Sequence, residues 1–234
     1  MSLINSVKQA ARSGTRIRGL HMTFAAPSVI ELLSATLDFV YIDGEHGCFD
    51  QRDVEVACVA AERHGLTAIA RVPGGSADII TRFLDRGVRG VVVPHIETVA
   101  QARQAVAATY FAPLGERSFG GGRPAFGAIS DKPAHMAECN ATMSLCLMIE
   151  SRAGIVVAGA LAAVEGVDYL SFGMMDLAQS LGHPGAPGHP EVTAAVAQAS
   201  TAIRAAGKRV REDFMSYCWI NDIISAGAQQ FFAA

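Results

Sequence analysis

The sequence predicts an α/β protein of the TIM (β/α)8 barrel class, because short apolar, β-branched runs alternate with helical stretches along the chain. Eight runs in strict strand–helix order favour a closed barrel over an open doubly wound sheet. The predicted strands are Arg16–Met22, Asp38–Asp43, Thr67–Val72, Gly90–Pro94, Ser144–Glu150, Tyr169–Gly173, Lys208–Val210 and Gln229–Ala233.

The helices predicted between these strands begin and end at recognisable signals. Pro27 suits a first helical turn, and Ser76 can cap the helix that follows it. Gly65 and Gly87 stand where helices should end, since glycine tolerates the left-handed residue that closes a helix. Besides an N-terminal helix in Met1–Arg12, the predicted helices are Pro27–Ala35, Asp50–His64, Ala77–Arg86, Thr98–Ala108, Lys132–Asn140, Ala153–Ala162, Glu191–Ala206 and Trp219–Ala226.

The C-terminal end departs from a complete barrel. The chain stops at the last predicted strand, so the eighth outer helix is expected to be truncated or absent. Neither an internal repeat nor a linker-like composition divides the chain, which predicts one barrel domain over residues 1–234. The connection Thr109–Ser130 is rich in glycine and proline and too long for a routine turn, so a functional or mobile loop is expected there.

Composition narrows the class of partner. The net charge of −3 is small and the basic residues are scattered, which argues against a nucleic-acid binder and favours a small-molecule partner. No apolar run approaches the roughly 20 residues that span a bilayer, and the N-terminus lacks a signal-peptide core, so a cytoplasmic location is expected. The five cysteines form no CxxC pair and are interpreted as reduced thiols.

Polar residues follow the predicted strands at their carboxyl ends, where barrel enzymes carry their chemistry. The second strand leads into Asp43-Gly44-Glu45-His46, the third into Arg71 and the fourth into His95. The fifth leads into Glu150, and the sixth into Gly173-Met174-Met175-Asp176. Acid, base and cation are therefore expected to converge on one rim.

Glu150 and Asp176 are the candidate metal ligands. Two carboxylates on adjacent strands suit a hard divalent cation such as Mg²⁺, and Mn²⁺ or Co²⁺ would also fit. The alternative is that each carboxylate caps a helix, and spacing alone does not separate the two interpretations.

His46 and Arg71 are the candidate catalytic residues. His46 can be a solvent-facing loop residue or a general base that Asp43 or Asp85 orients. Arg71 can hold a carboxylate or stabilise an enolate, or it can form a structural ion pair. His183 and His189 lie in a proline-bounded loop and are interpreted as turn residues, and His21, His64 and His135 receive no role.

Several motifs together resemble the class II metal-dependent 2-keto-acid aldolase family, of the HpcH/HpaI aldolase/citrate lyase type. They are LDFVYIDGEHGCFD, FLDRGVRGVVVPHIETVAQARQAVAATYFAPLGERS, MIES, and VEGVDYLSFGMMDLAQSLGHPG followed by HPEV. The resemblance covers nearly the whole chain.

The resemblance implies a divalent metal, Mg²⁺ first, held by Glu150 and Asp176, which binds the carboxylate and keto oxygen of pyruvate. It implies that Arg71 stabilises the enolate oxygen and that His46, with Asp43 or Asp85, transfers a proton. Backbone groups of Gly173, Met174 and Met175 would receive the pyruvate carboxylate. The expected reaction is reversible cleavage of a 4-hydroxy-2-oxo acid to pyruvate and an aldehyde by a homo-oligomer, which is a hexamer in the family.

Three departures from the family pattern bear on the substrate. Met148 stands where glutamine is typical, and Arg211–Asp213 replaces a glycine-containing apolar segment. Met174 and Met175, in the loop after the sixth strand, are expected to narrow the pocket or make it more apolar. Two alternatives to the aldolase therefore stay open. One is an oxaloacetate decarboxylase of the macrophomate-synthase kind, in which another electrophile captures the enolate, and the other is a non-catalytic binding barrel.

Overall fold

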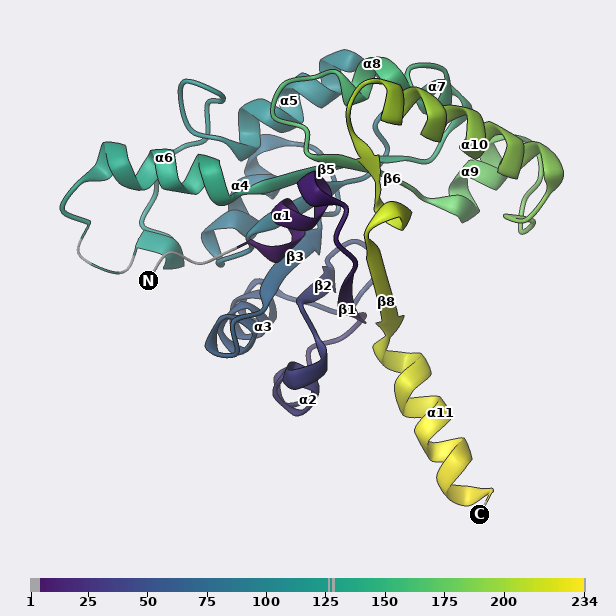
Figure 1. The fold of residues 1–234 in the computed structure, drawn as a ribbon. Coiled ribbons are helices and arrows are strands. Elements are labelled where there is room, and N and C mark those ends of the chain that lie inside the picture. Colours follow the sequence, from purple (N-terminus) through teal and green to yellow (C-terminus); the bar gives the residue numbers. More distant parts are fainter. Residues whose placement is uncertain (1–4, 126, 128, 234) are drawn as a thin grey trace.

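Eight parallel strands form one curled sheet in the computed structural model, which describes residues 5–125, 127 and 129–233 (Figure 1). The order across the sheet is β7, β6, β5, β4, β3, β2, β1, β8, so neighbours in sequence are neighbours in space up to β7. The strands are β1 Ile17–Met22, β2 Phe39–Asp43, β3 Thr67–Arg71, β4 Gly90–Val93, β5 Ser144–Ile149, β6 Tyr169–Phe172, β7 Arg209–Val210 and β8 Met215–Trp219. This confirms the predicted class, and the first seven predicted strands agree with the structure to within one residue at each end.

Helices follow the strands as the alternation predicts. Those in the described part of the chain are α1 Ser6–Ser13, α2 Pro27–Leu33, α3 Gln51–Arg63, α4 Ala77–Asp85, α5 Val99–Thr109, α6 Lys132–Thr142, α7 Arg152–Val156, α8 Ala158–Ala162, α9 Met174–Ser180, α10 Pro190–Ala205 and α11 Ile220–Phe232. Capping boxes at Asp50 and Thr98 begin α3 and α5. The predicted helix Ala153–Ala162 is divided into α7 and α8, and the short helix α9 was not predicted.

The end of the sheet differs from the prediction. Only the short 3-10 helix Arg211–Asp213 and Phe214 separate β7 from β8, so no outer helix lies between these two strands. β8 pairs in parallel with β1, from Ile17↔Met215 to His21↔Trp219, whereas β7 pairs with β6. The sheet therefore has two edges, at β7 and β8, which are not hydrogen-bonded to each other, and the barrel is not closed by a continuous ladder.

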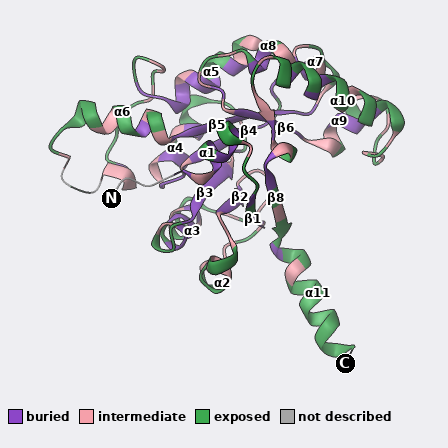
Figure 2. Cartoon of the chain, viewed as in Figure 1, coloured by how far each residue is buried: buried purple, intermediate pink, exposed green. Residues whose placement is uncertain are grey.

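The predicted strand Gln229–Ala233 is wrong, because residues 229–232 form the last turn of α11. The expected absence of a helix after the eighth strand is likewise wrong, since α11 follows β8 directly. This helix projects away from the sheet and is largely exposed (Figures 1 and 2). Ile220 is its one buried residue among those described, and Ile224, Phe231 and Phe232 are exposed.

Two apolar clusters lie on the two faces of the sheet. The larger one fills the space between the strands and the outer helices and contains residues such as Leu20, Ile42 and Val93. The smaller one lies inside the curl, where strand residues such as Phe39, Tyr41 and Ile69 pack with Val7 and Ala10 of α1. α1 thus closes the amino-terminal end of the barrel and leaves the carboxyl end of the strands open to ligands.

The long connection before α6 contains one short 3-10 helix, Arg123–Ala125. Residues 126 and 128 of this predicted functional loop lie outside the described part of the chain. No helix of the described residues is both long and apolar enough to cross a membrane.

Candidate active site

A cavity of about 330 Å³ opens at the carboxyl ends of the strands. Its walls include most of the predicted site residues, namely His46, Arg71, Glu150, Gly173, Met174, Met175 and Asp176. The prediction that these residues converge on one rim is therefore confirmed by their positions.

Asp43 and Arg71 form a buried, bidentate ion pair beside the cavity. They end β2 and β3 and are register partners in the sheet. Arg71 Nε donates to Asp43 Oδ1 at 3.1 Å and Arg71 Nη2 donates to Oδ2 at 2.6 Å, a bidentate pair of which the carboxylate is 1% exposed. Burial alone would raise the pKa of Asp43, but hydrogen bonds from His21 and Arg71 outweigh burial and hold this pKa well below its usual range. Arg71 is therefore fixed by a permanent anion behind it.

Glu150 and Asp176 follow β5 and β6 and line the same cavity. Neither is the N-cap of a helix, because Ser151 caps α7 and Gly173 stands at the N-cap position of α9. The capping interpretation of the two carboxylates is therefore wrong, although Asp176 lies in the first turn of α9. Burial raises the pKa of Glu150, and the charges of Glu45 and Asp176 add to this effect.

Gly173 supplies the space that Glu150 occupies. A Cβ atom at Gly173 would lie 2.0 Å from Glu150 Oε1, so only glycine permits the carboxylate to rest over the end of β6. Burial and the neighbouring charges of Glu45 and Asp176 raise the pKa of Glu150, and a hard divalent cation, whose preferred ligands are carboxylates, would relieve this repulsion. The residues present therefore fit the metal that the fold implies.

His95 links two of the acidic residues. Its Nδ1 lies 3.1 Å from Glu150 Oε2 and its Nε2 lies 3.2 Å from Glu45 Oε1, and its backbone N–H donates to Glu150 Oε2 at 2.8 Å. His95 has a φ of 55°, the single positive φ of a non-glycine residue in the described chain. A left-handed histidine held by three contacts is the kind of local strain found at functional sites.

The orientation predicted for His46 is not seen. Asp43 Oδ1 accepts the backbone N–H of His46 at 3.1 Å, but the nearest carboxylate to the ring is that of Glu45, at 4.0 Å from Nε2. Asp85 lies elsewhere, because Arg117 Nη2 pairs with its Oδ1 at 3.2 Å and it is not part of the cavity wall. Within one chain, Asp85 and His46 are therefore not brought together.

His21, Tyr41, Tyr217 and Trp219 also line the cavity and were not predicted as site residues. Trp219 was assigned to a helix, and His21 received no role because its neighbours in sequence are apolar. The missing information was the register of parallel strands, which places His21 beside Tyr41 and Trp219. The alternation of β1 was the one available signal, since every second side chain faces the barrel interior.

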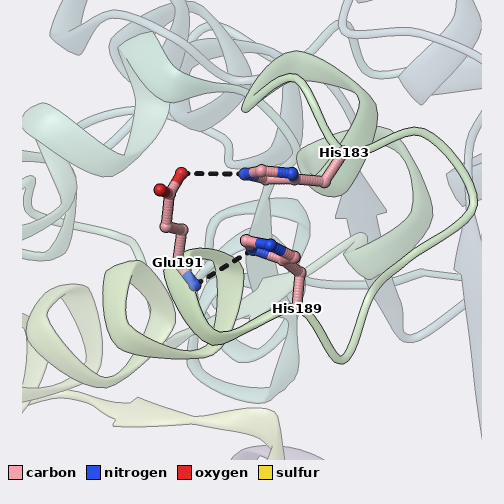
Figure 3. Close-up of side chains that lie close together, drawn as sticks. All are labelled: His183, His189 and Glu191. Atoms are coloured by element: carbon pink, nitrogen blue, oxygen red, sulfur yellow. Dashed lines mark hydrogen bonds and ion pairs between the residues drawn. The ribbon is translucent and has the colours of Figure 1, made fainter.

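His183, His189 and Glu191 form a second polar cluster, before and at the start of α10 (Figure 3). The two rings stack at 3.5 Å between centroids, His183 Nε2 lies 2.8 Å from Glu191 Oε2, and His189 Nδ1 accepts the backbone N–H of Glu191 at 3.3 Å. His189 is the N-cap of α10, which confirms its predicted turn role. One nitrogen of each ring is therefore already used by the turn, and a metal ligand set would have to displace these contacts.

An eight-stranded (β/α) fold that gathers carboxylates, a guanidinium and histidines at the carboxyl ends of its strands has the arrangement of a barrel enzyme. The family model described as HpcH/HpaI aldolase/citrate lyase matches residues 18–233, and the chain belongs to this family. It is an enzyme of the class II aldolase type, so the non-catalytic barrel is not supported.

Individual relatives agree with this assignment. A hydroxypyruvate/pyruvate aldolase of Pseudomonas aeruginosa is 34% identical over 206 residues, which cover 88% of this chain and 77% of the relative. A 2-keto-3-deoxy-L-rhamnonate aldolase of Salmonella gallinarum is 32% identical over 207 residues, 88% of this chain and 78% of the relative. The crystal structure of a HpcH/HpaI aldolase/citrate lyase family protein from Burkholderia cenocepacia superimposes with a TM-score of 0.87 at 30% identity and covers 98% of both chains.

Proposed function

We propose that the protein reversibly cleaves a 4-hydroxy-2-oxo acid into pyruvate and an aldehyde. The observation that carries this proposal is the presence of Glu150, Asp176, Arg71 and His46 around one cavity. Relatives named hydroxypyruvate/pyruvate aldolase and 2-keto-3-deoxy-L-rhamnonate aldolase support the same class of reaction. No oxidant or reductant is needed, since the carbon–carbon bond forms or breaks with transfer of one proton.

Glu150 and Asp176 would hold a divalent cation, with Mg²⁺ as the first candidate and Mn²⁺ or Co²⁺ as alternatives. When bound, such a cation acts as a Lewis acid that polarises the oxygens of a 2-oxo acid. The fit of Gly173 around Glu150, and the raised pKa of Glu150, support the assignment of this pair.

Arg71 would stabilise charge, and His46 would transfer a proton. The Arg71 guanidinium is held from behind by Asp43, so its charge faces the cavity and stabilises the negative charge that develops on the keto oxygen. His46 lines the cavity with a ring that is 65% exposed, which leaves it able to accept a proton from the aldol hydroxyl and return it. Backbone groups of Gly173, Met174 and Met175 complete the site as receptors for the substrate carboxylate.

The test is exchange of the pyruvate methyl protons in D₂O, followed by NMR with Mg²⁺, Mn²⁺ or Co²⁺ and with EDTA. Exchange that requires the metal is expected for the wild type, and Asp176→Asn and Glu150→Gln should reduce it at least about a hundredfold. Asp222→Asn and Glu138→Gln are matched controls, since both residues are exposed and lie outside the cavity. Exchange at the wild-type rate in Asp176→Asn would exclude the ligand assignment.

Added oxaloacetate separates the two enzymatic alternatives. An aldolase joins pyruvate to an aldehyde under these conditions, whereas a decarboxylase releases carbon dioxide from oxaloacetate and then hands the enolate to another electrophile. Turnover of oxaloacetate without any aldol product from a panel of aldehydes would favour the decarboxylase.

We propose in addition that the protein works as a cytoplasmic homo-oligomer. The largely exposed helix α11, with Ile224, Phe231 and Phe232 on its surface, supports the oligomer, because isolated apolar helix faces are costly in water. Sedimentation equilibrium of the wild type and of a Phe231→Ser/Phe232→Ser variant tests it, and a wild-type mass equal to one chain would refute it.

A further inference from the structure

His21 of β1 lies in the wall of the cavity and has no part in the proposed function. It is 3% exposed, and its ring is stacked between Tyr41, at 4.6 Å, and Trp219, at 3.8 Å between centroids. Both faces of the ring are therefore covered by protein. A residue kept for packing alone at this position would be apolar, because burying a polar group costs free energy unless the group forms a hydrogen bond. The contacts of the two ring nitrogens therefore decide what His21 does.

The polar contacts of the His21 ring lead to one residue, Asp43. Nε2 lies 3.4 Å from Asp43 Oδ2, and in the described part of the chain Nδ1 has no hydrogen-bond partner. Because an ionised carboxylate can only accept, the ring proton is on Nε2 and His21 is the donor. Burial lowers the pKa of His21, although Asp43 acts in the opposite direction, so the ring is neutral at pH 7. The other titratable or charged groups around the ring are Tyr41, Arg71, Arg211 and Tyr217.

The oxygen that His21 contacts is the one that forms the shortest bond to Arg71. Arg71 Nη2 lies 2.6 Å from Asp43 Oδ2, whereas Arg71 Nε and the backbone N–H groups of Glu45 and His46 bond to Oδ1. The torsion that turns a carboxylate plane is broad, so hydrogen bonds to both oxygens decide its orientation. Among the described residues, His21 supplies the donor that holds Oδ2 from the side away from Arg71.

Glu45 offers Arg71 a second carboxylate. Its Oε2 lies 3.2 Å from Arg71 Nε, and its side chain is 10% exposed. Two carboxylates thus contact one guanidinium, and the contact with Asp43 is bidentate only while the Asp43 carboxylate stays in the plane of the guanidinium. Rotation of the Asp43 carboxylate would break one of its two bonds and let Arg71 shift towards Glu45. A donor on Oδ2 opposes this rotation.

We propose that His21 is a positioning residue, which holds the Asp43 carboxylate in the plane where both of its oxygens bind Arg71. This inference rests on the proposed function, in which Arg71 stabilises the charge that develops on the keto oxygen. Tyr41 and Trp219 fix the ring in turn, so the hold on Arg71 extends through Asp43 and His21 to the edge strand β8. His21 itself neither transfers a proton nor contacts the substrate.

Two substitutions separate the donor from the ring. His21→Phe keeps an aromatic ring between Tyr41 and Trp219 and removes the donor, whereas His21→Gln keeps an N–H donor and removes the ring. His21→Phe should lower kcat for pyruvate proton exchange by about tenfold and leave KM within about twofold, because Arg71 acts on charge that develops in the transition state. His21→Gln should keep kcat within about threefold of the wild type. His64→Phe is the matched control, since His64 is the C-cap of α3 and lies outside the cavity.

The two variants give opposite results if the ring, and not the donor, is what matters. Wild-type kcat in His21→Phe would overturn the proposal. A larger loss of kcat in His21→Gln than in His21→Phe would overturn it as well, because stacking would then be the role of His21.

A double-mutant cycle tests whether His21 acts through Asp43. In the Asp43→Asn background, His21→Phe should lower kcat by less than about twofold, because the carboxylate that His21 positions is already absent. A role in packing alone would give the same loss of about tenfold in both backgrounds, since independent effects add in free energy. Equal losses in the two backgrounds would therefore contradict the proposal.

Chemical modification of Arg71 gives a reading that does not depend on catalysis. Phenylglyoxal reacts with guanidinium groups that are not held in ion pairs, and peptide mass spectrometry measures the rate at Arg71. Modification should be at least about threefold faster in His21→Phe than in the wild type, and unchanged in His21→Gln and His64→Phe. Equal rates in His21→Phe and the wild type would refute the hold on Arg71. Faster modification in His21→Phe, with no proton exchange in the wild type, would overturn the proposed function and leave the positioning of Arg71 standing.

Discussion

Replacing Asp43 by asparagine tests the electrostatic foundation of the site. Asp43 accepts five hydrogen bonds, two from Arg71, one from the His21 ring, and two from the backbone N–H groups of Glu45 and His46. Asparagine has one oxygen and one NH₂ group at these positions. If its oxygen keeps the Oδ1 contacts, its NH₂ group faces Arg71 Nη2, donor against donor, at the place of the 2.6 Å bond.

The expected loss of unfolding free energy in Asp43→Asn follows from the burial of the Asp43–Arg71 ion pair. Removing one partner of a buried ion pair costs about 3–5 kcal/mol, because the other charge stays behind unpaired. Here Glu45 Oε2 also lies 3.2 Å from Arg71 Nε and supplies part of the compensation, so we expect the lower end, about 3 kcal/mol. For a chain of this size that corresponds to a fall in Tm of roughly 6–12 °C. Proton exchange of pyruvate should fall by about a hundredfold, since Arg71 is no longer held in place.

Urea unfolding followed by Trp219 fluorescence measures the free energy of unfolding. Asp38→Asn, just before the amino end of β2, is the matched control, because its side chain is 38% exposed and its ion pair with Arg18, at 3.9 Å, is a surface pair worth less than about 1 kcal/mol. If Asp43→Asn unfolds within about 1 kcal/mol of the wild type, the carboxylate is not what holds Arg71 and the reasoning fails.

The pH dependence of the same comparison has a fixed sign. Because the folded pKa of Asp43 lies well below its ordinary value of 3.8, its contribution is complete above that pH and is lost as the pH falls towards the folded pKa. The difference in unfolding free energy between wild type and Asp43→Asn should be constant from pH 5 to 7. It should shrink by about 1 kcal/mol by pH 3. A difference that grows on acidification would contradict the assigned pKa direction.

Three further substitutions probe other parts of the molecule. Gly173→Ala places a Cβ 2.0 Å from Glu150 Oε1 and should displace this carboxylate. The affinity for Mn²⁺, measured by calorimetry, should fall at least about tenfold with little loss of stability. An unchanged affinity would contradict the proposed metal site. Lys8→Met removes the cation that lies 3.2 Å from the largely buried Asp168 carboxylate, and should lower the unfolding free energy in urea by about 2–4 kcal/mol. The double variant Lys8→Met/Asp168→Asn should recover part of this free energy. His189→Ala removes the side-chain cap of α10 and should lower the unfolding free energy by roughly 0.5–1 kcal/mol, and a stability unchanged by this substitution would show that the contact in Figure 3 is not a cap.

The fold was predictable where structure is local and periodic. Apolar runs bounded by glycine and capping residues identify β1 to β7 to within one residue, since each pattern is contained in a few consecutive positions. The eighth strand was not predictable in this way. The alternation rule requires a helix between consecutive parallel strands, and the chain here passes from Val210 to Met215 without one, so Met215–Trp219 was not recognised as a strand.

The site residues were likewise predictable only where the prediction did not need the pairing of particular strands. Asp43, Arg71, Glu150 and Asp176 were found because the carboxyl ends of parallel strands must meet at one rim, which needs no knowledge of register. His21 and Trp219 needed that register, since their contact depends on how β1 pairs with β8. Arg117, the partner of Asp85, lies in a long loop whose path could not be predicted from a periodic sequence pattern.

The acidic residues of the rim are best explained by function. Asp43, Glu45 and Glu150 are all nearly buried, with side chains 1%, 10% and 2% exposed, and each burial costs free energy unless a cation compensates it. Arg71 compensates Asp43 and part of Glu45. In the described part of the chain, the polar contacts of Glu150 are with the backbone N–H and the ring of His95, a residue with a positive φ. A sequence selected for stability alone would replace Glu150 by an apolar residue, because an unpaired buried charge is among the costliest features of a core. The close approach of Gly173, which leaves room for this carboxylate, therefore supports the proposal that the Glu150 charge serves a bound cation.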